Sequence, residues 1–174
     1  MKHSSACLFF LSGWLAACGA AGTGTQQQIA TYDPSSVPGT QVGVVTDDGS
    51  SPEPFFLDLY EDHPSAKDAL DATALQIVYL DYAFGAFVCK INATGTSGTV
   101  SDPCPSPDGK FWAFFYKRFG DEDWTFSTDR GVSAYFPEDG DMVAMVWTDY
   151  DPSAQAPARF PPDLTLVDLI STVR

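Results

Sequence analysis

The chain has 174 residues, of which 23 are Asp or Glu and 9 are Lys or Arg, so its formal charge at pH 7 is −14. This balance argues against a nucleic-acid binder and against electrostatic docking on an anionic membrane, because both need clustered Lys and Arg. The apolar share of 44% and the aromatic share of 14% are too high for a disordered acidic chain, so a packed core is expected.

The first residues have the pattern of an export signal. Lys2 gives a short basic start, and an apolar run follows from Ala6 to Ala17. A membrane-spanning helix needs about 20 apolar residues, so this shorter run predicts a signal-peptide core rather than a permanent anchor. The run ends in Leu15-Ala16-Ala17-Cys18, which resembles the lipobox of bacterial lipoproteins. The resemblance implies cleavage before Cys18 and lipidation of its sulfur, with fatty acyl chains such as palmitate.

The composition divides the chain into four segments. We expect a signal peptide over 1–17, a flexible tether of small and polar residues over 18–38, a folded domain over 39–150, and a Pro-rich tail with a short terminal helix over 151–174. The lipobox resemblance places the protein in the cell envelope. Gly19, where Asp would indicate inner-membrane retention, favours the outer membrane if the host is Gram-negative.

The secondary-structure pattern predicts a small α+β fold. Apolar runs and alternation predict strands over Thr40–Thr46, Pro54–Glu61, Gln76–Tyr82, Gly85–Ile91, Phe111–Phe119, Trp124–Ser127 and Met142–Trp147. Ser65, followed three residues later by Asp68, predicts the capped start of one helix. A long polar loop is expected over Asn92–Lys110, and a second short helix over Asp163–Val173. Strands, one helix and further strands indicate a sheet with a helix packed on one face.

A family resemblance covers much of this region. Its motifs are Gly85–Asn92, a loop holding Cys104, Phe111–Phe115, Trp124–Ser127 and Val143–Trp147. In this order and spacing they resemble the transcobalamin-like C-terminal domain family, which in bacteria is largely a domain of unknown function. The resemblance implies a β-grasp-like sheet with one packed helix, to which this chain adds an extra C-terminal segment. It also implies that the possible ligands include corrinoids.

Cys89 and Cys104 flank the polar loop. An even pair of cysteines in an oxidising envelope favours a disulfide, which would stabilise the fold by roughly 3 kcal/mol through loop closure. The alternatives are a free buried thiol and a metal-binding pair, although other metal-binding partners are missing.

The sequence predicts neither a catalytic residue nor a metal ligand. Outside the signal the only histidine is His63, expected in an exposed turn, and no Gly-x-Ser-x-Gly motif is present. The acidic residues are spread over turns, where Asp is common for backbone reasons. We therefore expect a protein that is not an enzyme.

Aromatic residues are the best candidates for a recognition surface: Trp112, Phe114, Tyr116, Trp124 and Tyr135. In a strand the first three share one face, which is either core or the wall of a groove. The sequence favours a non-catalytic binding domain for a small ligand, for which the family resemblance implies a corrinoid-like class, or for an envelope partner. The alternative is a structural or adhesion module that binds protein or polysaccharide and has no small-molecule ligand.

Overall fold

The computed structural model describes residues 39–96, 104 and 108–172. Within them the fold is mixed α+β and dominated by strands, which confirms the predicted class. The strands are β1 (Thr40–Asp47), β2 (Pro52–Leu59), β3 (Ile77–Tyr82), β4 (Gly85–Ile91), β5 (Thr94–Gly95), β6 (Phe111–Lys117), β7 (Thr125–Phe126), β8 (Met142–Thr148), β9 (Tyr150–Asp151) and β10 (Ala156–Pro157). The helices are α2 (Ala66–Ala72), the 3-10 turn η2 (Val132–Ala134) and α3 (Leu166–Thr172).

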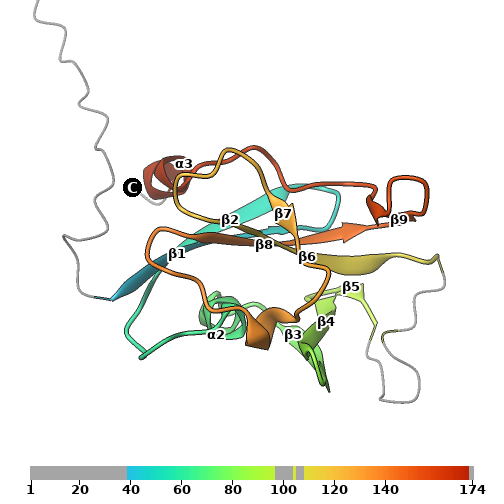
Figure 1. Ribbon diagram of the computed structural model, residues 1–174, viewed down its shortest axis with the longest axis horizontal. Coiled ribbons are helices and arrows are strands. Elements are labelled where there is room, and N and C mark those ends of the chain that lie inside the picture. Colours follow the sequence, from blue (N-terminus) through green and yellow to red (C-terminus); the bar gives the residue numbers. More distant parts are fainter. Residues whose placement is uncertain (1–38, 97–103, 105–107, 173–174) are drawn as a thin grey trace, which may run out of the picture. The chain divides into compact units, whose positions relative to one another are not determined.

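The main sheet has five strands in the order β2-β1-β8-β6-β7. Strands β1 and β8 are parallel, and the other neighbours are antiparallel. A second sheet, with the order β3-β4-β5, lies beside α2 and η2, as Figure 1 shows. Strand β5 falls inside the stretch predicted to be loop; its two residues pair with Lys90 and Ile91, a contact that no local pattern signals.

Both faces of the main sheet are buried. Trp112 and Phe114 of β6 pack with α2 and β4 in one core cluster, whereas Ala113 and Phe115 pack with α3 in another. Side chains alternate along a strand, so a strand covered on both faces must be apolar throughout. This explains why β6 and β8 are continuous apolar runs in the sequence.

Helix α2 begins as the sequence predicts. The Ser65 side chain accepts a hydrogen bond from the Asp68 N–H, and the Asp68 carboxylate accepts one from the Ser65 N–H at 2.8 Å. These reciprocal bonds satisfy backbone donors that the first helical turn leaves unpaired. Ala66, Ala69 and Leu70 then bury one face of the helix against the first core cluster.

The C-terminal segment covers the second face of the main sheet. Helix α3 begins with a similar cap, in which Asp168 accepts hydrogen bonds from the N–H and hydroxyl of Thr165. Its Leu169 packs onto β1 at Gly43, where a Cβ atom would lie 2.6 Å from a Leu169 methyl carbon. Gly43 therefore provides the space into which α3 docks. The preceding β9–β10 hairpin was not among the predicted elements.

Candidate functional site

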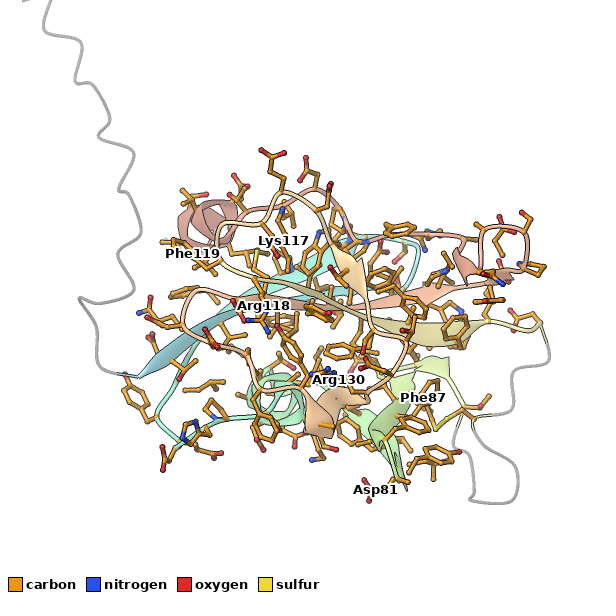
Figure 2. All side chains as sticks on the ribbon, viewed as in Figure 1. Asp81, Phe87, Lys117, Arg118, Phe119 and Arg130 are labelled. Carbon is orange, nitrogen blue, oxygen red and sulfur yellow. A yellow bond between two sulfur atoms is a disulfide. The ribbon has the colours of Figure 1, made fainter. Side chains whose placement is uncertain are left out.

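A cleft of about 360 Å³ opens between the two sheets, and we name it the β4–β6 cleft. Its lining is mostly apolar and aromatic and comprises Phe84, Ala86, Phe87, Val88, Phe111, Trp112, Ala113, Phe114, Phe126, Ser127, Thr128, Arg130, Gly131, Val132, Met145, Tyr150 and Gln155. Figure 2 shows where Phe87 lies on β4 and where Arg130 lies on the loop that leads into η2. The volume is in the range of small-ligand sites.

The lining shows that the cleft runs along strand edges. Four consecutive residues of β6, Phe111 to Phe114, and three consecutive residues of β4, Ala86 to Val88, contribute to it. Consecutive strand side chains point to opposite faces of a sheet. An unbroken run can therefore line one cleft only where the cleft borders the edge of the strand. The main-chain edges of β4 and β6 thus face the same cavity.

The loop from β7 to η2 forms a further wall. At its start the Ser127 N–H donates to the Phe114 carbonyl at 2.9 Å, and at its end the Gly131 N–H donates to the Phe84 carbonyl at 2.7 Å. A Cβ atom on Gly131 would collide with the Ala86 carbonyl, so the loop approaches β4 closely only because this residue is glycine. The loop therefore connects the edges of the two strands and closes one end of the cleft.

The charge of the β4–β6 cleft differs from that of the whole chain. None of its described lining residues is Asp or Glu, although the chain has 23 of them, and Arg130 is the one charged residue in the lining. The Arg130 Nη2 atom lies 3.2 Å from Asp129 Oδ2, and this hydrogen bond lowers the pKa of the Asp129 carboxyl. Such exposed pairs contribute little free energy, so the guanidinium can exchange this partner for the anionic group of a ligand.

The five aromatic candidates lie in three places. Trp112 and Phe114 line the β4–β6 cleft, and the Trp112 indole N–H donates to the Thr94 carbonyl at 3.2 Å. Tyr116 and Tyr135 stack on each other with ring centroids 4.6 Å apart and pack at the first core cluster. Trp124 packs with the second core cluster, on the other face of the sheet.

Tyr135 also ties two loops together. Its hydroxyl donates to the buried Asp141 carboxylate at 3.2 Å, and the same carboxylate accepts the backbone N–H groups of Phe119 and Glu138. Burial, and then the negative charge of Asp141, raise the pKa of the Tyr135 hydroxyl. With all these partners inside the protein, the geometry is that of a structural connection.

Trp124 borders a second cleft of different character. This cleft of about 860 Å³ is lined by Lys117, Asp121, Glu122, Asp123, Trp124, Phe160, Pro161, Asp163 and Thr165. The Lys117 amine, nearly buried, lies 3.7 Å from Asp163 Oδ1 and 6.0 Å from the Trp124 ring centroid. Lys117 thus already has a carboxylate of this chain, that of Asp163, as its partner.

The disulfide between Cys89 and Cys104 is present, which confirms the sequence prediction. Cys89 is buried and follows Val88 at the cleft-lining end of β4. The bond therefore ties Cys104 to the strand that forms one edge of the β4–β6 cleft. The predicted lipidation residue, Cys18, lies outside the described residues.

Within residues 39–96, 104 and 108–172, no group of three or more His, Cys, Asp or Glu side chains converges on a metal site. His63 is 88% exposed, as expected for a turn, and lies 3.6 Å from Asp62. The same residues include no helix of the length and apolarity that a bilayer crossing requires.

Comparison of the sequence with protein-family models and with curated proteins gives no match. Among solved structures, the chain is similar to a putative metal binding protein from Ruminococcus gnavus ATCC 29149. The two share 14% sequence identity with a TM-score of 0.45, over 63% of this chain and 97% of the other.

Sequence reasoning missed the β4 residues and Arg130. Phe87 lies in a strand that pattern predicts, but nothing local to β4 indicates that its edge faces β6. Arg130 lies in a short turn between polar residues, where a charged side chain is ordinary. A count of basic residues near the aromatic strands would have been the one available signal.

Proposed function

We propose that this chain is a lipid-anchored protein of the bacterial cell envelope that binds, without catalysis, an apolar ligand carrying one anionic group. The β4–β6 cleft is the proposed binding site. The observation that carries the proposal is the composition of the cleft: aromatic walls, no carboxylate among the described lining residues, and Arg130 as the one charge.

The physical reason is the contrast with the rest of the chain. With a formal charge of −14, this chain repels anions over most of its surface. A cleft whose described lining has no carboxylate and includes a guanidinium reverses that preference locally, because Arg forms paired hydrogen bonds with carboxylate and phosphate groups. The aromatic lining supplies the apolar contact area.

The resemblance to the transcobalamin-like C-terminal domain family supports a binding role and names corrinoids as one ligand class. A corrinoid is much larger than the β4–β6 cleft, so only a peripheral group of it would enter. We therefore favour a smaller ligand and keep a corrinoid as one arm of the test.

The binding test uses the mature lipoprotein in detergent and a matched aromatic series. Indole-3-acetate, indole-3-acetamide and tryptamine share one ring but carry a negative, a neutral and a positive group. We expect calorimetric affinity to fall in that order, and Arg130→Gln to reduce the affinity for the acid by about tenfold, because a charge-assisted hydrogen bond is lost.

Arg118→Gln is the matched control, because Arg118 is an exposed arginine outside the cleft whose nearest carboxylate, on Glu138, lies 3.9 Å away. It should leave the affinity unchanged. Absence of saturable binding by the whole series would overturn the proposed site. If a corrinoid binds more tightly than the indoles and Arg130→Gln does not change its affinity, the binding site lies outside the β4–β6 cleft.

The lipid anchor has its own test. Growth with a fatty-acid analogue should label the wild-type protein, and Cys18→Ala should abolish the label and release the protein from membranes. Cys89→Ala is the control for general loss of a cysteine. Label that persists in Cys18→Ala would contradict lipidation at this residue.

A further inference from the structure

The edge of β6 is only partly paired, and this determines what the β4–β6 cleft can recognise. All seven residues of β6 pair with β8, but β7 pairs with only Phe115 and Tyr116. The residues from Phe111 to Phe114 therefore lie beyond the end of β7, and they are the same residues that line the cleft.

The direction of the unpaired groups follows from the register. The Phe114 carbonyl accepts a hydrogen bond from Ser127 at 2.9 Å, so the main-chain polar groups of Phe114 face the β7 side. These directions repeat every second residue in a strand, so the N–H and C=O of Trp112 face the same side. Among the described residues, none forms a hydrogen bond with these two groups.

We infer that the ligand of the β4–β6 cleft is the C-terminal end of an extended polypeptide, which adds a short strand at Trp112 and places its carboxylate on Arg130. This inference rests on the proposed function, because it names the ligand class for the same site. Recognition by addition of a strand uses main-chain hydrogen bonds for affinity and side-chain contacts for selectivity.

Because the loop closes one end of the cleft, a bound peptide must end there. The loop between Ser127 and Gly131 crosses from the edge of β6 to the start of β4, so a strand that enters along β6 from Phe111 meets this loop after a few residues. Arg130 belongs to that loop. A strand whose final carboxylate reaches Arg130 runs parallel to β6, and its amino end points out of the cleft.

The charge and the apolar side chains of the cleft lining indicate which peptide ends would bind. Arg130 is the one charged side chain among the described lining residues, and its positive charge favours a terminal carboxylate over a terminal amine. Phe84 and Tyr150, which are 48% and 49% exposed, also line the cleft, together with Phe87 and Phe111. We therefore expect apolar side chains in the last residues of the peptide.

The test uses the mature lipoprotein and a fluorescein-labelled hexapeptide, Gly-Ser-Gly-Val-Ile-Val, with a free C-terminus. Two matched probes carry either a C-terminal amide or an N-methyl group on the Ile nitrogen, which removes one main-chain donor. Fluorescence anisotropy should show saturable binding of the first peptide and binding about tenfold weaker for the amide. The N-methyl peptide should also bind several-fold more weakly, because a strand pair loses a hydrogen bond.

Arg130→Gln should remove the difference between the acid and the amide, whereas Arg118→Gln should preserve it. Equal binding of the N-methyl and unmodified peptides would overturn strand addition. If the indole acids bind but the peptide does not, the inference fails while the proposed function stands. If neither the indoles nor the peptide binds, both fail.

Discussion

Asp47 and Arg159 form an ion pair that joins the first strand of the fold to its C-terminal segment. Arg159 Nη2 lies 2.8 Å from Asp47 Oδ2, although the residues are 112 positions apart in the sequence. The Asp47 side chain is 7% exposed, and its other oxygen accepts the Gly49 N–H at 2.8 Å. Arg159 also donates to the Trp147 carbonyl at 3.2 Å. The pair therefore fixes the C-terminal segment against the ends of β1 and β8.

Removal of Arg159 should destabilise the protein. Arg159→Ala leaves the buried Asp47 carboxylate without its cation, and we expect the free energy of unfolding to fall by about 1–3 kcal/mol. Urea denaturation followed by circular dichroism measures this loss. Arg118→Ala is the matched control, because its partner Glu138 is 80% exposed and such pairs contribute about 0–1 kcal/mol. Equal effects of the two substitutions would contradict the role of the Asp47 pair.

Helix α3 should contribute substantially to stability through Leu169. This side chain is 1% exposed and packs on β1 at Gly43, so Leu169→Ala should cost about 2–5 kcal/mol in unfolding free energy. Val167→Ala, in the same helix but only partly buried, should cost clearly less. Thermal denaturation of both variants distinguishes them; a Leu169→Ala variant as stable as wild type would show that α3 does not dock in solution.

Loss of the Cys89–Cys104 disulfide should lower stability without unfolding the cores. In Cys104→Ser the closed loop is opened, and we expect a loss of about 3 kcal/mol from the loop-closure entropy. Comparison of oxidised and reduced wild type by chemical denaturation measures the same quantity. Alkylation before reduction, read by intact mass, should leave Cys89 and Cys104 unmodified in the native protein.

The capping box of α2 should make stability depend on acid pH. Hydrogen bonds from the Ser65 side chain, more than any other cause, hold the pKa of the Asp68 carboxyl below its ordinary value of 3.8. A carboxyl with a lowered folded-state pKa stabilises the fold above the unfolded-state pKa, and this contribution is lost as the pH falls through the folded-state pKa. Asp68→Asn should therefore be about 0.5–1 kcal/mol less stable at pH 7.

Comparison of wild type with Asp68→Asn at low pH tests whether the charge of Asp68 causes the difference in stability. Below the folded-state pKa of Asp68, wild type and Asp68→Asn should unfold at nearly equal denaturant concentrations, because the carboxyl is protonated. Asp123→Asn, at an exposed turn position, is the control for the loss of a carboxyl elsewhere in the chain. A stability difference for Asp68→Asn that persists unchanged to pH 2 would rule out the charge as its cause.

Local patterns in the sequence were sufficient to predict several elements of the fold. Strand β4 and the start of β6 lie where the apolar pattern places them, and α2 starts beside Ser65 because its cap involves residues only three positions apart. The Cys89–Cys104 pairing could also be predicted, since these two cysteines form an even pair that flanks one polar loop. Strand β5 was missed because its two residues have no apolar pattern and are strand only through pairing with β4.

The five aromatic candidates show how far the sequence can predict the candidate site. Trp112 and Tyr116 share one face of β6, yet Trp112 borders the β4–β6 cleft while Tyr116 stacks on Tyr135. The difference depends on where β7 stops pairing with β6, and that depends on the path of the loop toward β4. No periodicity within β6 contains this information.

The sequence by itself determined the acidic character, most strands and the cap of α2, because each depends on composition or on neighbours a few residues apart. It also predicted the Cys89–Cys104 disulfide, from an even pair of cysteines that flanks one polar loop. The tertiary structure alone decided that both faces of the main sheet are covered and that the edges of β4 and β6 face one cleft. A strand edge becomes a site only through the absence of a neighbouring strand. That arrangement depends on how segments far apart in the chain pack, and here it brings Trp112 and Arg130 into one cleft, whose described lining residues include no Asp or Glu.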